Sequence, residues 1–284
     1  TQFLFDSKRK IEAIVPRESN DAHRLIEEFM VAANVSAAQF LLSKTLPALY
    51  RVHETPSAEK LSGLREFLGE LGLVLGGGDD PSPHDYATLL QAAHQRQDAH
   101  LLQTVMLRSM KQAVYHPDNV GHFGLALEAY AHFTSPIRRY PDLLVHRAIC
   151  HLINNKKINK WSYSHKDMVQ LGEHCSMASR RADEATRDVA DWLKCEFMQD
   201  HVGECYDGVI SGVTGFGLFV ELNDIYIEGL VHITALKNDY YEFDANGHRL
   251  MGERTRQSYR LADKIRVKVV RVDLDEKKID LELA

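Results

Sequence analysis

The sequence lacks several features that would assign a protein to a class directly. Four cysteines are present without any C-x-x-C spacing: Cys150, Cys175, Cys195 and Cys205. This arrangement argues against a disulfide framework and favours a reducing cytosol. No unbroken run of about 18 apolar residues exists, so we expect no membrane-spanning helix. The first residues show neither an initiator Met nor a signal-peptide pattern, and we expect the chain to be part of a longer one.

Positive charge is also scarce. The 284 residues carry a net charge of −6, whereas nucleic-acid-binding domains usually have a basic surface. The charge is unevenly distributed: residues 131–194 have a net charge of +4, between −4 for residues 1–130 and −6 for residues 195–284. A basic segment inside an acidic protein fits a channel that attracts phosphates locally, although chance remains the alternative.

The residue patterns of metal sites are missing as well. Hydrolysis of a phosphodiester by Mg²⁺ needs clustered carboxylates, because this ion prefers oxygen ligands. Asp79 and Asp80 form a loop tip, and the acidic residues at 273–276 lie in an expected hairpin turn, where such residues are common. The histidines show no spacing typical of a zinc site. We therefore expect no metal-binding residue in this chain.

Two patterns of apolar residues divide the chain. Up to about residue 199 the apolar residues mostly recur with helical spacing, after one or two strands within residues 1–16. The expected helices cover residues 20–42, 55–71, 82–94, 98–115, 142–155 and 166–198. From residue 203 onward the pattern alternates and is rich in β-branched residues. Five short strands in this region predict a small closed barrel of the OB type and an α+β fold class.

The segment 130–142 has the highest density of chemical groups. It places Arg138 beside Arg139 between two prolines, with aromatic residues on both sides and Thr134 and Ser135 just before them. Guanidinium groups bind phosphate oxygens in a bidentate manner, and aromatic rings stack on bases. This loop is therefore suited to hold a nucleic-acid strand by its backbone. A surface loop with solvated arginines is the alternative, but loops this rich in chemical groups usually carry a site.

Strings along the chain resemble the RNB-domain exoribonuclease family, nearest to its bacterial ribonuclease R branch. The clearest is HFTSPIRRYPDL at residues 132–143. Further matching strings are NDAHRLIEE at 20–28, GHFGLAL at 121–127, HRA at 146–148 and RRADEATRDV at 180–189. The resemblance covers essentially the whole chain. It implies the C-terminal part of a mainly helical RNB catalytic domain over residues 1–199, followed by the barrel over residues 200–284.

The resemblance also implies an activity. Members of this family are processive 3′→5′ exoribonucleases that hydrolyse RNA with Mg²⁺ and release nucleoside 5′-monophosphates. Their metal-binding aspartates belong to an Asp-rich motif before the segment that matches residue 1. We therefore expect this chain to be inactive alone; a non-catalytic RNA-binding fragment is the alternative. The expected partners are single-stranded RNA and the N-terminal remainder of the same polypeptide, in the cytoplasm and without a membrane.

The resemblance also implies roles for individual residues. Arg138 matches the family arginine that contacts the RNA backbone at the active site. Glu28 matches an acidic residue near that site, with a place on the helix surface as the alternative. Arg139 is expected to bind a neighbouring phosphate or to pair with Asp142. Further residues of this loop expected around the RNA are His132, Thr134, Ser135 and Tyr140.

The barrel region resembles the S1 RNA-binding domain through VTGFGLFV at residues 213–220 and GLVHI at 229–233. The resemblance places Phe216, Phe219 and His232 on the RNA-binding face, with Tyr206 and Arg271 as weaker candidates. Bases stack on aromatic rings without sequence preference. The alternative for the Phe pair is barrel core. On one regular strand, residues three positions apart face opposite sides, so at most one of them is expected in the core.

Overall fold

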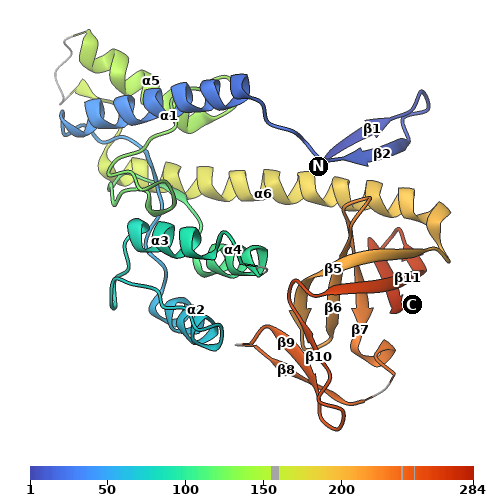
Figure 1. The fold of residues 1–284 in the computed structure, drawn as a ribbon. Helices are drawn as coiled ribbons and strands as arrows, with labels where there is room; N and C mark the ends of the chain where they lie inside the picture. The colour runs from blue at the N-terminus through green and yellow to red at the C-terminus, as the bar shows by residue number, and fades with distance from the viewer. Residues whose placement is uncertain (97, 155–159, 238, 246) are drawn as a thin grey trace.

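The computed structural model describes residues 1–96, 98–154, 160–237, 239–245 and 247–284 (Figure 1). A mainly helical part comes first and a β-rich part follows. The helices are α1 Asp21–Leu42, α2 Ala58–Glu70, α3 Pro83–Ala93, α4 Ala99–Ser109, α5 Tyr140–Ile153 and α6 His165–Met198. Short 3₁₀ turns are η1 Phe123–Leu125, η3 Gln199–His201 and η4 Ile233–Ala235.

The 34-residue helix α6 connects the two parts of the molecule (Figure 1). It begins at a capping box, in which Ser164 and Asp167 each accept a hydrogen bond from the other's backbone N–H. Its first half packs against β4 Val114–His116, which pairs with β3 Tyr50–Val52. A Cβ at position 172 would lie 2.5 Å from the carbonyl oxygen of Tyr115, so only glycine allows this approach.

The β-rich part contains the predicted five-stranded closed barrel. Its strands are β5 Cys205–Thr214, β6 Gly217–Leu222, β7 Ile227–His232, β11 Lys264–Asp273 and β12 Lys278–Leu283, in the order β11-β12-β7-β6-β5. The β12–β7 pair is parallel and the other pairs are antiparallel. A three-stranded sheet of β8 Tyr241–Asp244, β9 Arg249–Gly252 and β10 Ser258–Arg260 is inserted between β7 and β11. The alternating pattern of the sequence did not predict this inserted sheet.

The barrel and the end of α6 share one apolar core. Cys195 and Met198 of α6 are buried in the same cluster as the barrel residues Ile210 and Val267. The hairpin of β1 Gln2–Phe5 and β2 Ile11–Val15 adds two buried isoleucines to this cluster. The two regions of the chain therefore pack together, and burial of this apolar surface stabilises their arrangement.

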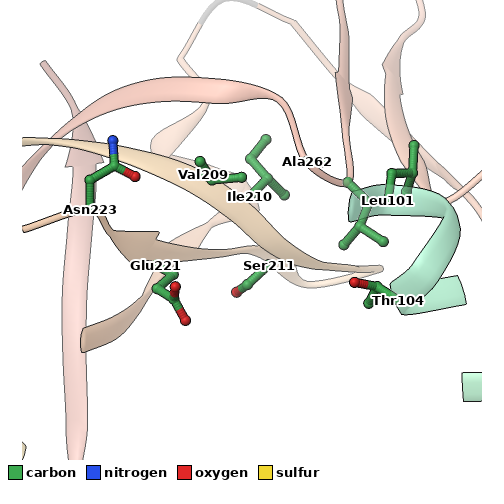
Figure 2. Close-up of a pocket in the computed structure, with 9 residues that line it drawn as sticks. Leu101, Thr104, Val209, Ile210, Ser211, Glu221, Asn223 and Ala262 are labelled. Atoms are coloured by element: carbon green, nitrogen blue, oxygen red, sulfur yellow. The ribbon is translucent and has the colours of Figure 1, made fainter. Parts of the chain in front are cut away.

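Helix α4 also contacts the barrel, around a cavity of about 210 Å³ (Figure 2). Leu101 and Thr104 of α4 face β5 residues Val209 and Ser211 across it. Arg108 of α4 donates a hydrogen bond from Nη2 to the Ser211 carbonyl oxygen at 2.9 Å. These contacts hold α4 to the barrel.

Two predicted helices differ from the structure at their ends. The helix predicted to reach residue 115 ends at Ser109, and Tyr115 lies in strand β4. Tertiary pairing explains the difference, because β4 exchanges hydrogen bonds with β3, more than sixty residues earlier in the chain. The helix predicted to reach residue 155 ends at Ile153, and residue 155 lies outside the described residues.

Helix α1 is buried only in its second half. Asn20 caps it, and Ala37, Ala38 and Leu41 pack in a core cluster with α5 residues. In the first half, four apolar side chains are 41–61% exposed: Leu25, Ile26, Phe29 and Met30. The sequence has no long unbroken apolar run, yet α1 is long and apolar enough by composition to cross a membrane. Core helices of soluble proteins satisfy the same criterion.

Candidate nucleic-acid interface

The arginine loop before α5 is closed by one buried carboxylate. Asp142 has no exposed surface, and its Oδ1 accepts hydrogen bonds from Ser135 N and Arg139 Nη2, both at 2.8 Å. The backbone N–H groups of Arg138 and Arg139 donate to the Ser135 carbonyl oxygen. Pro141 occupies the first turn of α5, where its missing N–H costs no hydrogen bond. The loop is therefore held in one shape before any ligand binds.

A cavity of about 670 Å³ lies between this loop and α6. Arg138, Arg139 and Tyr140 line it from the loop side, and His174 and Asp183 line it from α6. The two predicted arginines therefore share a cavity with the middle of α6. Arginine side chains at a cavity wall can bind phosphate oxygens that enter it.

The two arginines have different environments. The Arg138 side chain is exposed, and its guanidinium makes no hydrogen bond or ion pair with the part of the chain that the structure describes. Arg139 is 24% exposed and forms the ion pair with Asp142, so the structure shows the pairing alternative for this residue. Arg138 is therefore free to bind an anion. A phosphate role for Arg139 stays a prediction, because its side chain also lines the cavity.

His132 lies behind the arginines as a neutral imidazole. Burial, followed by the charges of Arg139 and Arg51, lowers the pKa of His132 to about 3. Its Nδ1 lies 2.8 Å from the Tyr115 hydroxyl oxygen. Thr134 is partly buried in the same loop. These residues therefore support the loop around the cavity without adding positive charge at neutral pH.

Tyr140 lies at the rim of the cavity. Its side chain is 42% exposed, and the Arg147 guanidinium carbon lies 5.8 Å from its ring centroid. Glu28 is exposed on the first half of α1, and no hydrogen bond or ion pair among the described residues joins it to the arginine loop. The structure thus brings Tyr140 to the cavity, and the role predicted for Glu28 stays a prediction.

Arg51, which lies behind the Tyr115 wall of the cavity, is a residue that sequence reasoning missed. It lies on β3 directly opposite Tyr115 of β4, and its guanidinium carbon is 4.7 Å from the Tyr115 ring centroid. Because the β3–β4 pair is a long-range contact, neither residue shows a local sequence signal. The short alternation of Tyr50, Arg51 and Val52, with buried residues on both sides of the arginine, is the only local hint.

The barrel presents the two predicted phenylalanines together. Phe216 and Phe219 form an edge-to-face pair with ring centroids 5.8 Å apart, and Phe216 is 49% exposed. The expectation that at most one would be core is confirmed, because neither is buried. They meet because Phe216 precedes strand β6, which begins at Gly217, so the two residues do not lie on one regular strand.

These rings line a groove of about 300 Å³ between the barrel and α6. Asp191 and Lys194 of α6 form one wall, and Lys277 of the β11–β12 turn and Lys278 at the start of β12 form another. The Lys277 ammonium forms an ion pair with Asp188 of α6. The groove thus combines aromatic faces with lysines, a combination suited to single-stranded nucleic acid.

The remaining barrel candidates lie apart from each other. His232 is exposed at the end of β7, opposite Gly217 of β6, and its Nδ1 lies 2.8 Å from Thr234 Oγ1. Arg271 lies on β11, where its Nε is 3.0 Å from Asp280 Oδ2. Tyr206 donates its hydroxyl proton to Glu204 at 2.6 Å. The structure therefore brings His232 next to the strand that carries Phe219, whereas Arg271 is engaged two strands away.

No carboxylate cluster accompanies these groups. Across the described ranges, no group of three or more His, Cys, Asp or Glu side chains is placed to hold a metal ion. All four cysteines are free thiols. The described residues therefore do not form a Mg²⁺ site, and no chemical step through that ion follows from them.

Comparisons with known proteins agree with this arrangement. The RNB domain family matches residues 1–155, and the S1 RNA binding domain family matches residues 199–284. Ribonuclease R of Escherichia coli is 57% identical over 99% of this chain, and ribonuclease R of Vibrio cholerae is 56% identical over 100% of it. The chain spans 36% of the length of each of these relatives.

Comparison with solved structures also matches the chain to a ribonuclease R. Mycoplasma genitalium RNase R, 26% identical, covers the whole chain with a TM-score of 0.92 in its apo form and in complex with ribose methylated single-stranded RNA. The chain covers 45% of that protein. Yeast Ssd1, described as a pseudonuclease, shares the fold over 82% of this chain with a TM-score of 0.65; the chain covers 29% of it. The chain belongs to the RNB family and carries an S1 RNA-binding domain.

Proposed function

We propose that the intact protein is a ribonuclease R-like, processive 3′→5′ exoribonuclease that hydrolyses RNA to nucleoside 5′-monophosphates in the cytoplasm. In this proposal the chain comprises part of the catalytic domain, residues 1–199, and the S1 domain, residues 200–284. Support comes from the family membership and from the RNA complex of the Mycoplasma relative. The observation that carries it is the unpaired Arg138 guanidinium at the wall of a cavity large enough for a nucleotide.

In this function the two sites handle different parts of one RNA strand. Arg138 binds the phosphate at or next to the bond to be cut and stabilises the negative charge that develops there. Phe216 and Phe219 stack on bases farther along the strand, with His232 beside them. The proposal retains the roles predicted for the other residues around the active site, which are Arg139, Glu28, His132, Thr134, Ser135 and Tyr140. It also retains the RNA-binding role predicted for Arg271 on the barrel.

In this proposal, only the intact protein binds Mg²⁺. In the intact protein, Mg²⁺ would supply activation of the attacking water and neutralisation of charge on the leaving oxygen. Its ligands in this proposal lie in the N-terminal remainder of the polypeptide, outside the 284 residues. The chain's own contribution is to bind and orient the strand.

Arg138→Ala in the intact enzyme tests this function. We expect turnover of single-stranded RNA to fall about 10²- to 10³-fold, because one charge-stabilising donor is lost. Binding through the barrel should change far less. Equal loss of turnover and of barrel-mediated binding would contradict the catalytic placement of Arg138.

A non-catalytic RNA-binding module is the second candidate. It is favoured by the absence of a carboxylate cluster from the described part of this chain. Incubation of the 284-residue chain with end-labelled RNA and Mg²⁺ measures the activity of this segment. We expect salt-sensitive binding without release of mononucleotides. Robust release would show that the chain contains a metal site of its own.

A further inference from the structure

Arg51 is a partly buried arginine that stacks on an aromatic ring beside the arginine loop. It is the central residue of β3, and its backbone N–H donates a hydrogen bond to the Tyr130 carbonyl oxygen at 2.9 Å. The guanidinium lies over the Tyr115 ring, at 4.7 Å from the centroid. A guanidinium that contacts an aromatic ring keeps its planar N–H donors, which can bind a phosphate in a bidentate manner.

The guanidinium of Arg51 has no protein acceptor. It is partly buried, yet it makes no hydrogen bond or ion pair within the described ranges of the chain. Its pKa is lowered by burial first, and the nearby Arg139 lowers it further, whereas Tyr115 and Asp183 raise it. A partly buried cation beside another cation costs free energy, and an anion supplied by a ligand offsets that cost.

The nearby carboxylates do not neutralise this group. Asp142 is already paired with Arg139, and Asp183 acts on Arg51 only through space. Tyr115 and Asp183 both line the cavity that contains Arg138. Arg51 therefore lies behind the same cavity, over the ring that forms part of its wall.

We infer that Arg51 binds a second phosphate of the RNA strand whose neighbouring phosphate is held by Arg138. This inference rests on the proposed function. Arg138 is exposed, whereas Arg51 is partly buried over Tyr115, so the pair combines a contact at the surface with a second contact behind the cavity wall. A role as a purely structural cation–π partner is the competing explanation.

The test is equilibrium binding of fluorescein-labelled oligoadenylate to the 284-residue chain over a range of salt concentrations. Arg51→Met removes the charge and keeps an apolar side chain over Tyr115. We expect about tenfold weaker binding at low salt. The plot of log affinity against log salt should flatten by about 0.7, the slope of one phosphate contact to a single strand. Arg96→Met is the matched control, because Arg96 is exposed and paired with Asp98, and it does not line this cavity.

Oligonucleotides with one neutral methylphosphonate linkage identify the phosphate. At one position the neutral linkage should weaken binding by the wild-type chain and leave binding by Arg51→Met unchanged. Arg51→Lys keeps the charge, so it should restore most of the salt slope. If thermal denaturation shows that Arg51→Met is unfolded, Arg51→Lys replaces it as the test protein. The neutral linkage should then still weaken binding by Arg51→Lys, because this variant keeps the charge that contacts the phosphate.

Two results would overturn the inference. One is binding by Arg51→Met within twofold of Arg96→Met at every salt concentration. The other is an equal methylphosphonate cost in wild type and Arg51→Met at every position. Arg138→Ala separates the inference from the proposed function. If only Arg138→Ala weakens binding, Arg51 is structural and the proposed function stands; if neither variant does, the phosphate site itself is wrong.

Discussion

The cavity at the arginine loop and the groove at the barrel are built in opposite ways. In the cavity, a fully buried carboxylate, Asp142, holds Arg139 and the backbone of Ser135, and these contacts leave Arg138 unpaired at the wall. In the groove, the exposed ring of Phe216 meets the partly buried ring of Phe219, and Lys277 beside them forms a surface ion pair with Asp188. One site depends on buried charge and the other on exposed aromatic surface.

This difference predicts different responses to salt and mutation. Phosphate binding by guanidinium groups releases counterions and weakens as salt rises. Stacking on aromatic rings depends little on salt and tolerates any base. Loss of a buried charge partner destabilises the fold, whereas loss of an exposed ring mainly weakens the ligand.

The largest effect is expected for Asp142→Asn. The variant keeps the shape of the side chain but removes the charge opposite Arg139, which leaves a partly buried cation without its partner. We expect the free energy of unfolding, measured by urea denaturation, to fall by about 3–5 kcal/mol.

Asp79→Asn is the control for this loss, because the Asp79 side chain is fully exposed. Its effect should stay within about 0.5 kcal/mol. Similar stability changes in the two variants would show that the buried pair does not hold the loop.

The second-largest effect is expected on the binding of single-stranded RNA by Arg138. Arg138→Ala should weaken binding of single-stranded RNA by this chain by about 1.5–3 kcal/mol at low salt, because a charge-assisted contact is lost. The loss should shrink as salt rises, as measured by fluorescence anisotropy. Thermal stability should stay close to that of the wild type, since the guanidinium has no partner in the described chain. A loss of affinity that does not depend on salt would contradict an electrostatic contact.

Phe219→Ala tests the aromatic groove at the barrel. We expect RNA affinity to fall by about 1–3 kcal/mol, the usual contribution of one stacked base. Unlike the Arg138 variant, it should leave the dependence of affinity on salt unchanged. Phe5→Ala, at a 50% exposed position of the β1–β2 hairpin, is the matched control and should leave affinity unchanged. An altered salt slope in Phe219→Ala would mean that the groove binds mainly phosphate.

The smallest effect concerns pH. Because burial and nearby arginines lower the pKa of His132 to about 3, this imidazole stays neutral in the fold while it protonates in the unfolded chain near pH 6.5. Stability should therefore be lost as pH falls below about 6.5, by at most about 1.4 kcal/mol per pH unit from this group. Carboxylates titrate lower, so urea denaturation above about pH 5 isolates the histidines.

His132→Gln should make this pH dependence shallower. His122→Gln should have an effect of the same sign and similar size above about pH 5, because burial lowers the pKa of His122 to about 4. A pH dependence that is unchanged in His132→Gln would show that this imidazole is solvated in the fold.

Local sequence signals predicted most of the helices and the barrel. The helices predicted from residues 20 and 166 begin within one residue of those positions, after the caps Asn20 and Ser164, because a cap lies within three residues of the N–H group that it satisfies. The alternating pattern after residue 203 predicted the five barrel strands for the same reason. Strand β4 was predicted as helix, because only its distant partner β3 makes it extended.

The sequence by itself determined the caps, the periodicities, the arginine loop and the strings that place this chain in its family. These properties depend on neighbours a few residues apart, so they can be recognised in one dimension. The tertiary structure alone decided that Asp142 occupies Arg139 while Arg138 stays free, and that Arg51 meets Tyr115 across a strand pair. Those outcomes follow from burial and long-range pairing, which only the folded chain brings about.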